Sequence, residues 1–275
     1  ILYSFISAKG SDFNFLITKQ KQDVKTMAYS ISLAGKGGTG KTTVAGMLVK
    51  YLLMKQKTPI LAVDADSNAN LNEVLGVKVT DTLGNAREDM KKGNVPPGMT
   101  KDVFISMRLD QAIIEEQGFD LMVMGQPEGS GCYCAANSLL TGFLDRLMGN
   151  YPNIVIDNEA GMEHISRLTT KNVDLLLIVS DTSRRGIQAA IRINKLAKNL
   201  NIGVDKSCLI INQAKEEPAD AIMDMIRKDD LELAGVIPED QTIYEYDLNG
   251  RPTITMAQEN KAVKAAFKIF ENIIK

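Results

Sequence analysis

Several features that would place a chain in a familiar class are scarce or missing here. The 275 residues include three cysteines and one histidine, and the formal net charge is −2. Three cysteines cannot build a disulfide framework, and so small a net charge argues against a broad nucleic-acid-binding face. No apolar run reaches the roughly 18 residues that span a bilayer, and no secretory signal is evident. We therefore expect a cytoplasmic protein that binds neither nucleic acid nor membrane.

The remaining composition is that of an ordinary globular protein. Apolar residues make up 44% of the chain and charged residues 24%, and the length suffices for one large core. Residues 1–26 precede the first patterned segment and receive no function. Residues 27–275 are expected to form a single domain.

Short apolar runs alternate with helical patterns along most of the chain. Runs rich in Val, Ile and Leu indicate strands that helices cover on both faces. The predicted strands are 31–34, 59–63, 121–124, 154–157, 175–179, 209–212 and 234–237. This alternation predicts an α/β fold with one doubly wound, mostly parallel sheet. Residues 80–105 carry several Gly, Pro and Asn residues, and we expect a loop-rich excursion there.

A glycine-rich segment follows the first predicted strand and matches G-x-x-x-x-G-K-[ST]. Its residues are Gly35, Lys36, Gly37, Gly38, Thr39, Gly40, Lys41, Thr42 and Thr43. Glycines let several backbone N–H groups turn toward one pyrophosphate, and the following helix adds its positive N-terminal end. In such loops the lysine, here Lys41, reaches the β- and γ-phosphates, and the hydroxyl, here Thr42, binds Mg²⁺. The segment predicts an ATP-hydrolysing enzyme that binds ATP or ADP with Mg²⁺.

Acidic residues follow two other predicted strands. Asp157 ends an apolar strand in the manner of a Walker-B carboxylate, which holds Mg²⁺ through a water molecule. Asp64 and Asp66 are separated by one residue, and such residues in an extended stretch project to the same side. Because ligands bind beyond the carboxyl ends of parallel strands, we expect all three carboxylates near the phosphates. A structural role as turn formers or caps is the alternative for each.

Two cysteines, Cys132 and Cys134, lie in a Gly-Ser-Gly-rich segment before a helical pattern. Thiols at i and i+2 can chelate one soft metal ion, and a helix N-terminus close by favours the thiolate. Two thiolates are too few for a closed tetrahedral site. A two-fold axis through this segment would supply four, so the pair is interpreted as one half of a site that bridges a homodimer.

The segment GKGGTGKTT resembles the phosphate loop of the ArsA/MinD/nitrogenase-reductase class of ATPases. The resemblance implies that Lys36 crosses a dimer interface to the partner's nucleotide and contributes to catalysis with Lys41. It also implies that Asp66 positions the attacking water and Asp64 lies in the outer coordination of Mg²⁺. In that class an asparagine at the position of Asn212 hydrogen-bonds adenine, and a segment like that around Pro238 flanks the base.

Taken together, GKGGTGKTT, GCYCAANS and DNEAGMEHISR resemble the CooC-type nickel-insertion ATPases, which are accessory proteins of carbon monoxide dehydrogenase. The resemblance extends from about residue 30 to the end of the chain. It implies that Cys132 and Cys134 bind Ni²⁺ or Zn²⁺ and that ATP turnover drives nickel delivery. Carbon monoxide dehydrogenase and acetyl-CoA synthase are equally compatible as targets. One departure is Asp-Ala-Asp-Ser at residues 64–67, where D-x-D-P is commoner.

Two other functions remain open at this point. A nitrogenase-reductase-like protein would hold an iron–sulfur cluster between its subunits, although that family draws its cysteines from well-separated loops. A partition or division ATPase would act by positioning, and its membrane form ends in a basic amphipathic helix. Residues 261–275 have the required spacing, but a helix packed on the core explains them better.

Other conspicuous residues are assigned structural roles. Cys208 lies at the edge of a predicted strand and is expected in the core. His164, the single histidine, is expected in a structural position. Arg184 and Arg185 follow Ser183, a predicted helix N-cap, and are expected to be solvated.

Overall fold

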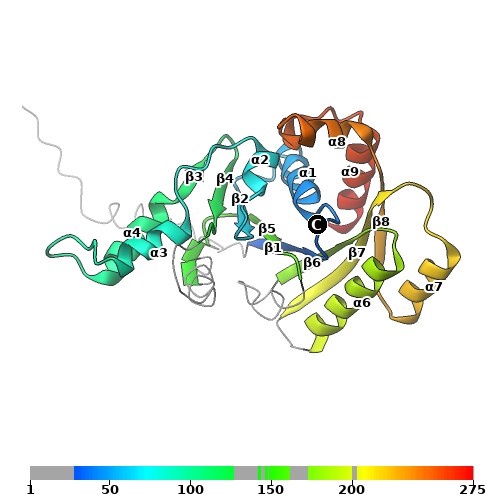
Figure 1. The fold of residues 1–275 in the computed structure, drawn as a ribbon, viewed down its shortest axis with the longest axis horizontal. Helices are drawn as coiled ribbons and strands as arrows, with labels where there is room; N and C mark the ends of the chain where they lie inside the picture. Colours follow the sequence, from blue (N-terminus) through cyan, green and yellow to red (C-terminus); the bar gives the residue numbers. More distant parts are fainter. Residues whose placement is uncertain are drawn as a thin grey trace, which may run out of the picture.

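The computed structural model describes residues 28–126, 142–143, 146–147, 149–161, 173–199 and 203–274. These residues form one eight-stranded sheet with helices on both faces (Figure 1). The strands are β1 (Tyr29–Gly35), β2 (Ile60–Ala65), β3 (Ile113–Glu115), β4 (Phe119–Val123), β5 (Asn153–Asn158), β6 (Val173–Ser180), β7 (Val204–Ala214) and β8 (Leu233–Pro238). The described helices are α1 (Lys41–Met54), α2 (Leu71–Leu75), α3 (Leu83–Lys91), α4 (Lys101–Gln111), α6 (Arg184–Asn199), α7 (Asp220–Lys228), α8 (Gln241–Leu248), the 3₁₀ turn η2 (Thr253–Thr255) and α9 (Lys261–Ile273).

The strand order is β3-β4-β2-β5-β1-β6-β7-β8, and all neighbouring pairs are parallel except β3 and β4. After β1 the chain builds one half of the sheet outward through β2 and β4. After β5 it crosses to the other side of β1 and continues through β6, β7 and β8. The winding direction therefore reverses beside β1. A doubly wound sheet binds its ligands at such a reversal, beyond the carboxyl ends of the strands.

Alternate residues of the strands enter different cores. Leu175 and Leu177 face a core built with α1 and α9, whereas Leu176 and Ile178 face a core built with α6 and α7. A third core lies under α3 and α4, on the opposite face of β2 from α1. The period of two places helices on both faces of the sheet, as the apolar runs predicted.

The predicted fold class and all seven predicted strands are confirmed. The structure adds β3, a three-residue antiparallel edge strand with two half-buried Ile residues and an exposed Glu, which is too short to give a periodic signal. The expectation of a loop-rich excursion at 80–105 is wrong for most of its length, because Thr82 and Thr100 cap the helices α3 and α4 there. Within the described residues, no helix combines the length and apolar character required to cross a bilayer.

The C-terminal segment is a packed helix. Its apolar residues Ala262, Val263, Ala266, Ile269, Phe270 and Ile273 are buried and contact α1 and β8 (Figure 1). The hydrophobic face that a membrane-binding helix would offer is therefore part of the core.

Candidate phosphate-binding site

The loop between β1 and α1 needs glycine at two positions for different reasons. A Cβ on Gly35 would lie 2.2 Å from the carbonyl oxygen of Val179 in β6. Gly40 has φ 79°, in the left-handed region, and a Cβ there would lie 2.5 Å from Nδ2 of Asn212. Side chains at these positions would push the loop away from β6 and β7, so the glycine spacing read from the sequence serves packing as well as ligand approach.

The loop leads directly into the N-terminus of α1, which is left open. Gly40 is the N-cap, no side chain caps the helix, and no acidic residue occupies its first turn. By contrast, side chains of Thr82, Thr100, Asp240 and Asn260 cap α3, α4, α8 and α9. The backbone N–H groups at the start of α1 thus face an anion site without a competing protein oxygen.

Lys41 places a cation beside this helix end. The residue is 7% exposed, and its Nζ lies 3.4 Å from the carbonyl oxygen of Lys36. Burial lowers the pKa of Lys41, while the nearby carboxylates of Asp157 and Asp66 act in the opposite direction. A partly desolvated ammonium is a strong partner for a phosphate because little water has to be removed when the anion binds.

Asp157, at the end of β5, has the surroundings expected of a metal-binding carboxylate. It is 2% exposed, and its Oδ1 has no hydrogen-bond partner among the described residues. The Thr42 hydroxyl donates a hydrogen bond to the carboxylate. Burial raises the pKa of Asp157 to about 7, although the Thr42 bond opposes the rise; the carboxylates of Asp64 and Asp66 raise it further. An unpartnered buried oxygen beside a hydroxyl fits a hydrated Mg²⁺ ion.

Asp64 and Asp66 follow β2 and belong to the same electrostatic cluster, but each also shapes its own loop. Asp64 accepts backbone hydrogen bonds from Asp66 (3.0 Å) and Leu71 (2.8 Å), and burial raises its pKa to about 6. Asp66 Oδ1 accepts the backbone N–H of Asn68 at 2.8 Å. Both residues therefore act as turn formers, which was the structural alternative. They also lie close enough to Asp157 and Lys41 to interact with them electrostatically.

A second part of the site lies where β7 and β8 end. A cavity of about 310 Å³ is lined by Thr43, Asn212, Gln213, Pro238, Glu239, Asp240, Ile243, Tyr244 and Asp247. The structure thus brings Asn212 and Pro238 together with Thr43 of the phosphate loop. Asn212 also donates its Nδ2 hydrogen to the carbonyl oxygen of Thr39 at 2.9 Å. No local pattern in the sequence signals this fastening role or the side chains that α8 contributes.

The turn after β5 touches the phosphate loop directly. The N–H of Gly161 lies 3.4 Å from the carbonyl oxygen of Gly35, and a Cβ on Gly37 would lie 3.7 Å from Ala160 Cβ. The side chain of Lys36, in contrast, is exposed at the mouth of the site. Because they are in contact, a movement of the turn after β5 would displace the phosphate loop, and the reverse.

The proposed soft-metal site falls outside this geometry. Cys132, Cys134 and His164 lie outside the described residues, and the described residues contain no group of three or more His, Cys, Asp or Glu side chains arranged to hold a metal. Cys208 is fully buried in β7, as expected, and burial raises the pKa of its thiol to about 12.

Fold and site together define the class of phosphate-loop ATPases with a doubly wound sheet. The sequence model of the CobQ/CobB/MinD/ParA nucleotide-binding domain matches residues 31–254, and the chain belongs to this family. Like its relatives of the MinD and ParA type, it is an ATP-binding ATPase.

Three similar proteins illustrate the range of the family. An uncharacterized ATP-binding protein of Methanocaldococcus jannaschii is 41% identical, with 89% of this chain and 98% of the relative covered. The carbon monoxide dehydrogenase accessory protein CooC of Rhodospirillum rubrum is 33% identical, with 80% and 87% covered. Among solved structures, the septum site-determining protein MinD of Pyrococcus horikoshii in complex with Mg-ADP has a TM-score of 0.68 and 27% identity, covering 90% of this chain and 97% of that one.

Proposed function

We propose that this ATPase carries Ni²⁺ to a nickel enzyme, either carbon monoxide dehydrogenase or acetyl-CoA synthase, and that nucleotide turnover controls release of the metal. The observation that carries the proposal is the pair Cys132 and Cys134 in a chain that also carries the phosphate loop of an ATPase. The similarity to an accessory protein of carbon monoxide dehydrogenase supports it.

In this proposal each residue around the phosphate loop has a definite task. The loop backbone and Lys41 hold the phosphates of ATP. Thr42 and Asp157 would hold Mg²⁺, with Asp64 nearby, and the bound ion would supply positive charge to the phosphates. Asp66 orients the attacking water. Asn212, whose Oδ1 is not committed to Thr39, accepts a hydrogen bond from adenine beside Pro238.

The catalytic centre is completed by a second copy of the chain. Lys36 is exposed at the mouth of the site, where it can reach the nucleotide of the partner subunit. A cation that arrives only on closure stabilises the developing charge of phosphoryl transfer only in the closed dimer. The same two-fold axis brings two Cys132/Cys134 pairs together and gives the metal four thiolates.

Metal and nucleotide are then linked through the dimer. If ATP favours the closed state and closure changes the spacing of the cysteine pairs, each ligand alters the affinity of the other by the same factor. The turn at Ala160 and Gly161 contacts the phosphate loop. A change of the phosphate loop on hydrolysis can therefore displace the segment that follows β5.

The rival functions predict different results. A membrane-positioning ATPase would need a free amphipathic helix, whereas the apolar face of α9 is buried. An iron–sulfur protein would show broad visible absorption when purified without oxygen. The nickel carrier should be colourless until Ni²⁺ is added.

The decisive experiment is a titration of Ni²⁺ and Zn²⁺ into wild type, Cys132→Ser, Cys134→Ser and the matched control Cys208→Ala. We expect one tightly bound ion per two chains in wild type and in the control, and loss of tight binding in the other two variants. Binding should weaken below neutral pH because the thiolates must be deprotonated. Equal stoichiometry in all four proteins would refute the proposal.

A further inference from the structure

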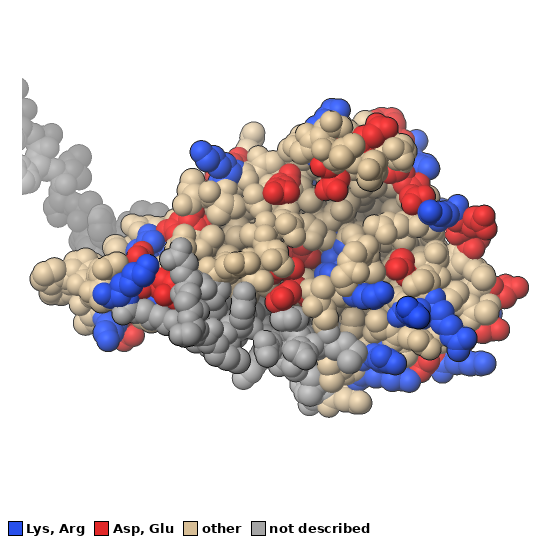
Figure 2. Space-filling model, in the orientation of Figure 1, with Lys and Arg blue, Asp and Glu red and all other residues tan. Residues whose placement is uncertain are grey.

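The exposed side of α6 is mostly cationic. Its exposed positions are Arg184, Arg185, Arg192, Lys195, Lys198 and Asn199, and the helix contains no acidic residue. At 100° per residue these positions fall on one side of the helix, and its 16 residues extend for about 24 Å. We call this row the α6 stripe. Figure 2 shows Lys and Arg side chains gathered over the region of α6 and α7.

The first two arginines of the α6 stripe occupy positions where a positive charge destabilises the helix. The N-terminus of a helix carries partial positive charge, so cations in the first turn are unfavourable there and carboxylates are favourable. Arg184 and Arg185 occupy that turn without an acidic neighbour in it. The carboxylate of Asp181 lies just before the helix, where it accepts two hydrogen bonds from Ser183. Arg184 and Arg185 are exposed and so are available to a partner.

The two halves of the stripe differ in their partners. Lys195 forms an ion pair with Asp229, and Lys198 lies 3.8 Å from Asp230. No carboxylate of the described residues forms an ion pair with Arg184, Arg185 or Arg192. Three exposed guanidinium groups remain, and each can bind a carboxylate through two parallel hydrogen bonds.

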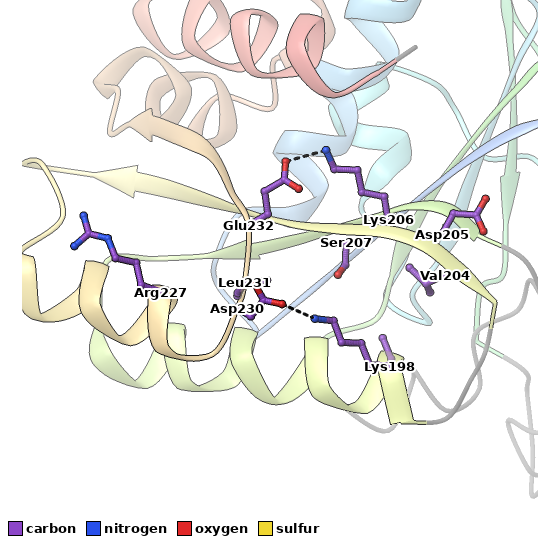
Figure 3. A pocket seen from close by; sticks show the side chains of 10 residues that line it. Lys198, Val204, Asp205, Lys206, Ser207, Arg227, Asp230, Leu231 and Glu232 are labelled. Atoms are coloured by element: carbon purple, nitrogen blue, oxygen red, sulfur yellow. Dashed lines mark ion pairs between the residues drawn. The ribbon is translucent and has the colours of Figure 1, made fainter.

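The stripe leads into a hollow at its C-terminal end. A cavity of about 480 Å³ lies there, and Lys198, Lys206 and Arg227 line it together with Asp205, Asp230 and Glu232 (Figure 3). Lys206 pairs with Glu232 at 2.8 Å. The stripe thus continues into a recess that carries both positive and negative side chains. Such a recess can accept a protruding part of a protein partner. Because Asp205, Asp230 and Glu232 offset the cations of the recess, the positive charge available to an anionic partner is concentrated at the other end of the stripe.

We infer that the α6 stripe is the docking surface for a partner protein that presents a cluster of carboxylates. The partner's identity rests on the proposed function, in which it is the nickel enzyme. The start of α6 follows β6, whose Val179 lies beside Gly35 of the phosphate loop. A partner bound at Arg184 and Arg185 therefore sits next to the nucleotide site.

The test compares Arg185→Glu/Arg192→Glu with Lys264→Glu/Lys268→Glu, two exposed lysines of α9 that give the same change in net charge. The probes are purified nickel-free carbon monoxide dehydrogenase and acetyl-CoA synthase of the same organism. Binding is measured by biolayer interferometry at 50 and 300 mM salt. Wild type should bind and weaken with salt. We expect the α6 variant to bind at least about tenfold more weakly and the α9 variant to change by less than about twofold.

Three further readouts separate docking from other roles. Urea unfolding should show no loss of stability in the α6 variant, because the first of its two substitutions places a carboxylate in the first turn of the helix, where it is favourable. ATP-dependent dimerisation should be unchanged; its loss would mean that the stripe joins two copies of this chain and would overturn the inference. Tighter binding to a 30-base-pair DNA duplex or to phosphatidylglycerol vesicles than to either enzyme, lost in the same variant, would also overturn it.

Failure of this inference differs from failure of the proposed function. If the α6 variant binds as wild type does, the α6 stripe is not the docking surface. The nickel-carrier proposal, which the metal titration tests, is then unaffected. No binding of wild type to either enzyme refutes both the docking surface and the named partner.

Discussion

At the scale of single residues, several side chains of the site serve the fold and the ligand together. Asp64 holds the loop after β2 through two backbone N–H groups, and Asn212 holds the phosphate loop through Thr39. Asp157 differs because burial leaves one of its oxygens without a partner among the described residues. A buried carboxylate with one unpartnered oxygen is costly to ionise, and that cost is measurable.

We predict that Asp157→Asn changes the pH dependence of stability when Mg²⁺ and nucleotide are absent. The folded pKa of about 7 exceeds the ordinary value of 3.8, so between these values the folded state binds more protons than the unfolded state. The contribution of Asp157 is therefore fully present below about pH 4 and is lost as pH rises through 7, by up to about 1.4 kcal/mol per unit. The variant should lack this loss.

Urea unfolding at pH 5, 6, 7 and 8 measures the difference, with Asp102→Asn, at an exposed position, as the control. Wild type and Asp102→Asn should fall in parallel while Asp157→Asn stays flatter. Parallel curves for all three proteins would show that Asp157 is charged throughout.

At the scale of elements, the helices α6 and α9 each bury one face and expose the other. Helix α9 buries a continuous apolar face, and Phe270 packs against Tyr51 of α1 with ring centroids 5.7 Å apart. Helix α6 buries Ile187, Ala190 and Ile193 and turns its cations outward. Both are amphipathic and basic, and both carry cations at the positive end of the helix dipole, Arg184 and Arg185 in α6 and Lys261 in α9.

We predict that Phe270→Ala destabilises the protein by about 3–5 kcal/mol, because a fully buried aromatic side chain leaves a cavity. Lys268→Ala, one exposed position on the same helix, should change the free energy of unfolding by less than about 0.5 kcal/mol. Chemical denaturation decides. A small effect of Phe270→Ala would mean that α9 detaches from the sheet easily and would reopen the membrane-positioning alternative.

At the scale of the whole molecule, one copy forms a nucleotide site that is closed by its own chain on the side of the sheet and open where Lys36 lies. The turn at Gly161 contacts the phosphate loop at Gly35. In the proposed dimer, the second copy would add its Lys36 to this open side.

We predict that Lys36→Ala retains ATP binding, which depends on Lys41 and the loop backbone, but loses ATP-dependent dimerisation and at least about 10³-fold of turnover, the lower end of the range for a cation supplied in trans. Mass in solution with a non-hydrolysable ATP analogue and steady-state ATPase rates test this. Lys78→Ala, at another exposed lysine, should behave as wild type. Retained turnover in Lys36→Ala would place the whole hydrolytic machinery in one chain.

The sequence predicted the fold class and the phosphate loop because both depend on local patterns. Short runs rich in Val, Ile and Leu mark buried strands wherever they occur, and Gly35, Gly40 and Lys41 are close in the chain as well as in space. The helices α3 and α4 were missed because Gly, Pro and Asn near their ends outweighed the capping signals of Thr82 and Thr100.

The sequence by itself determined which backbone segments form strands and where a pyrophosphate can bind, since both follow from residues a few positions apart. Only the tertiary structure decided that Asn212 holds Thr39, 173 residues away, and that Asp157 is left with an oxygen unpartnered among the described residues. It also decided that the apolar face of α9 is buried against the core. The burial of a side chain and its hydrogen-bond partners depend on which distant segments pack together, and no local sequence pattern determines that.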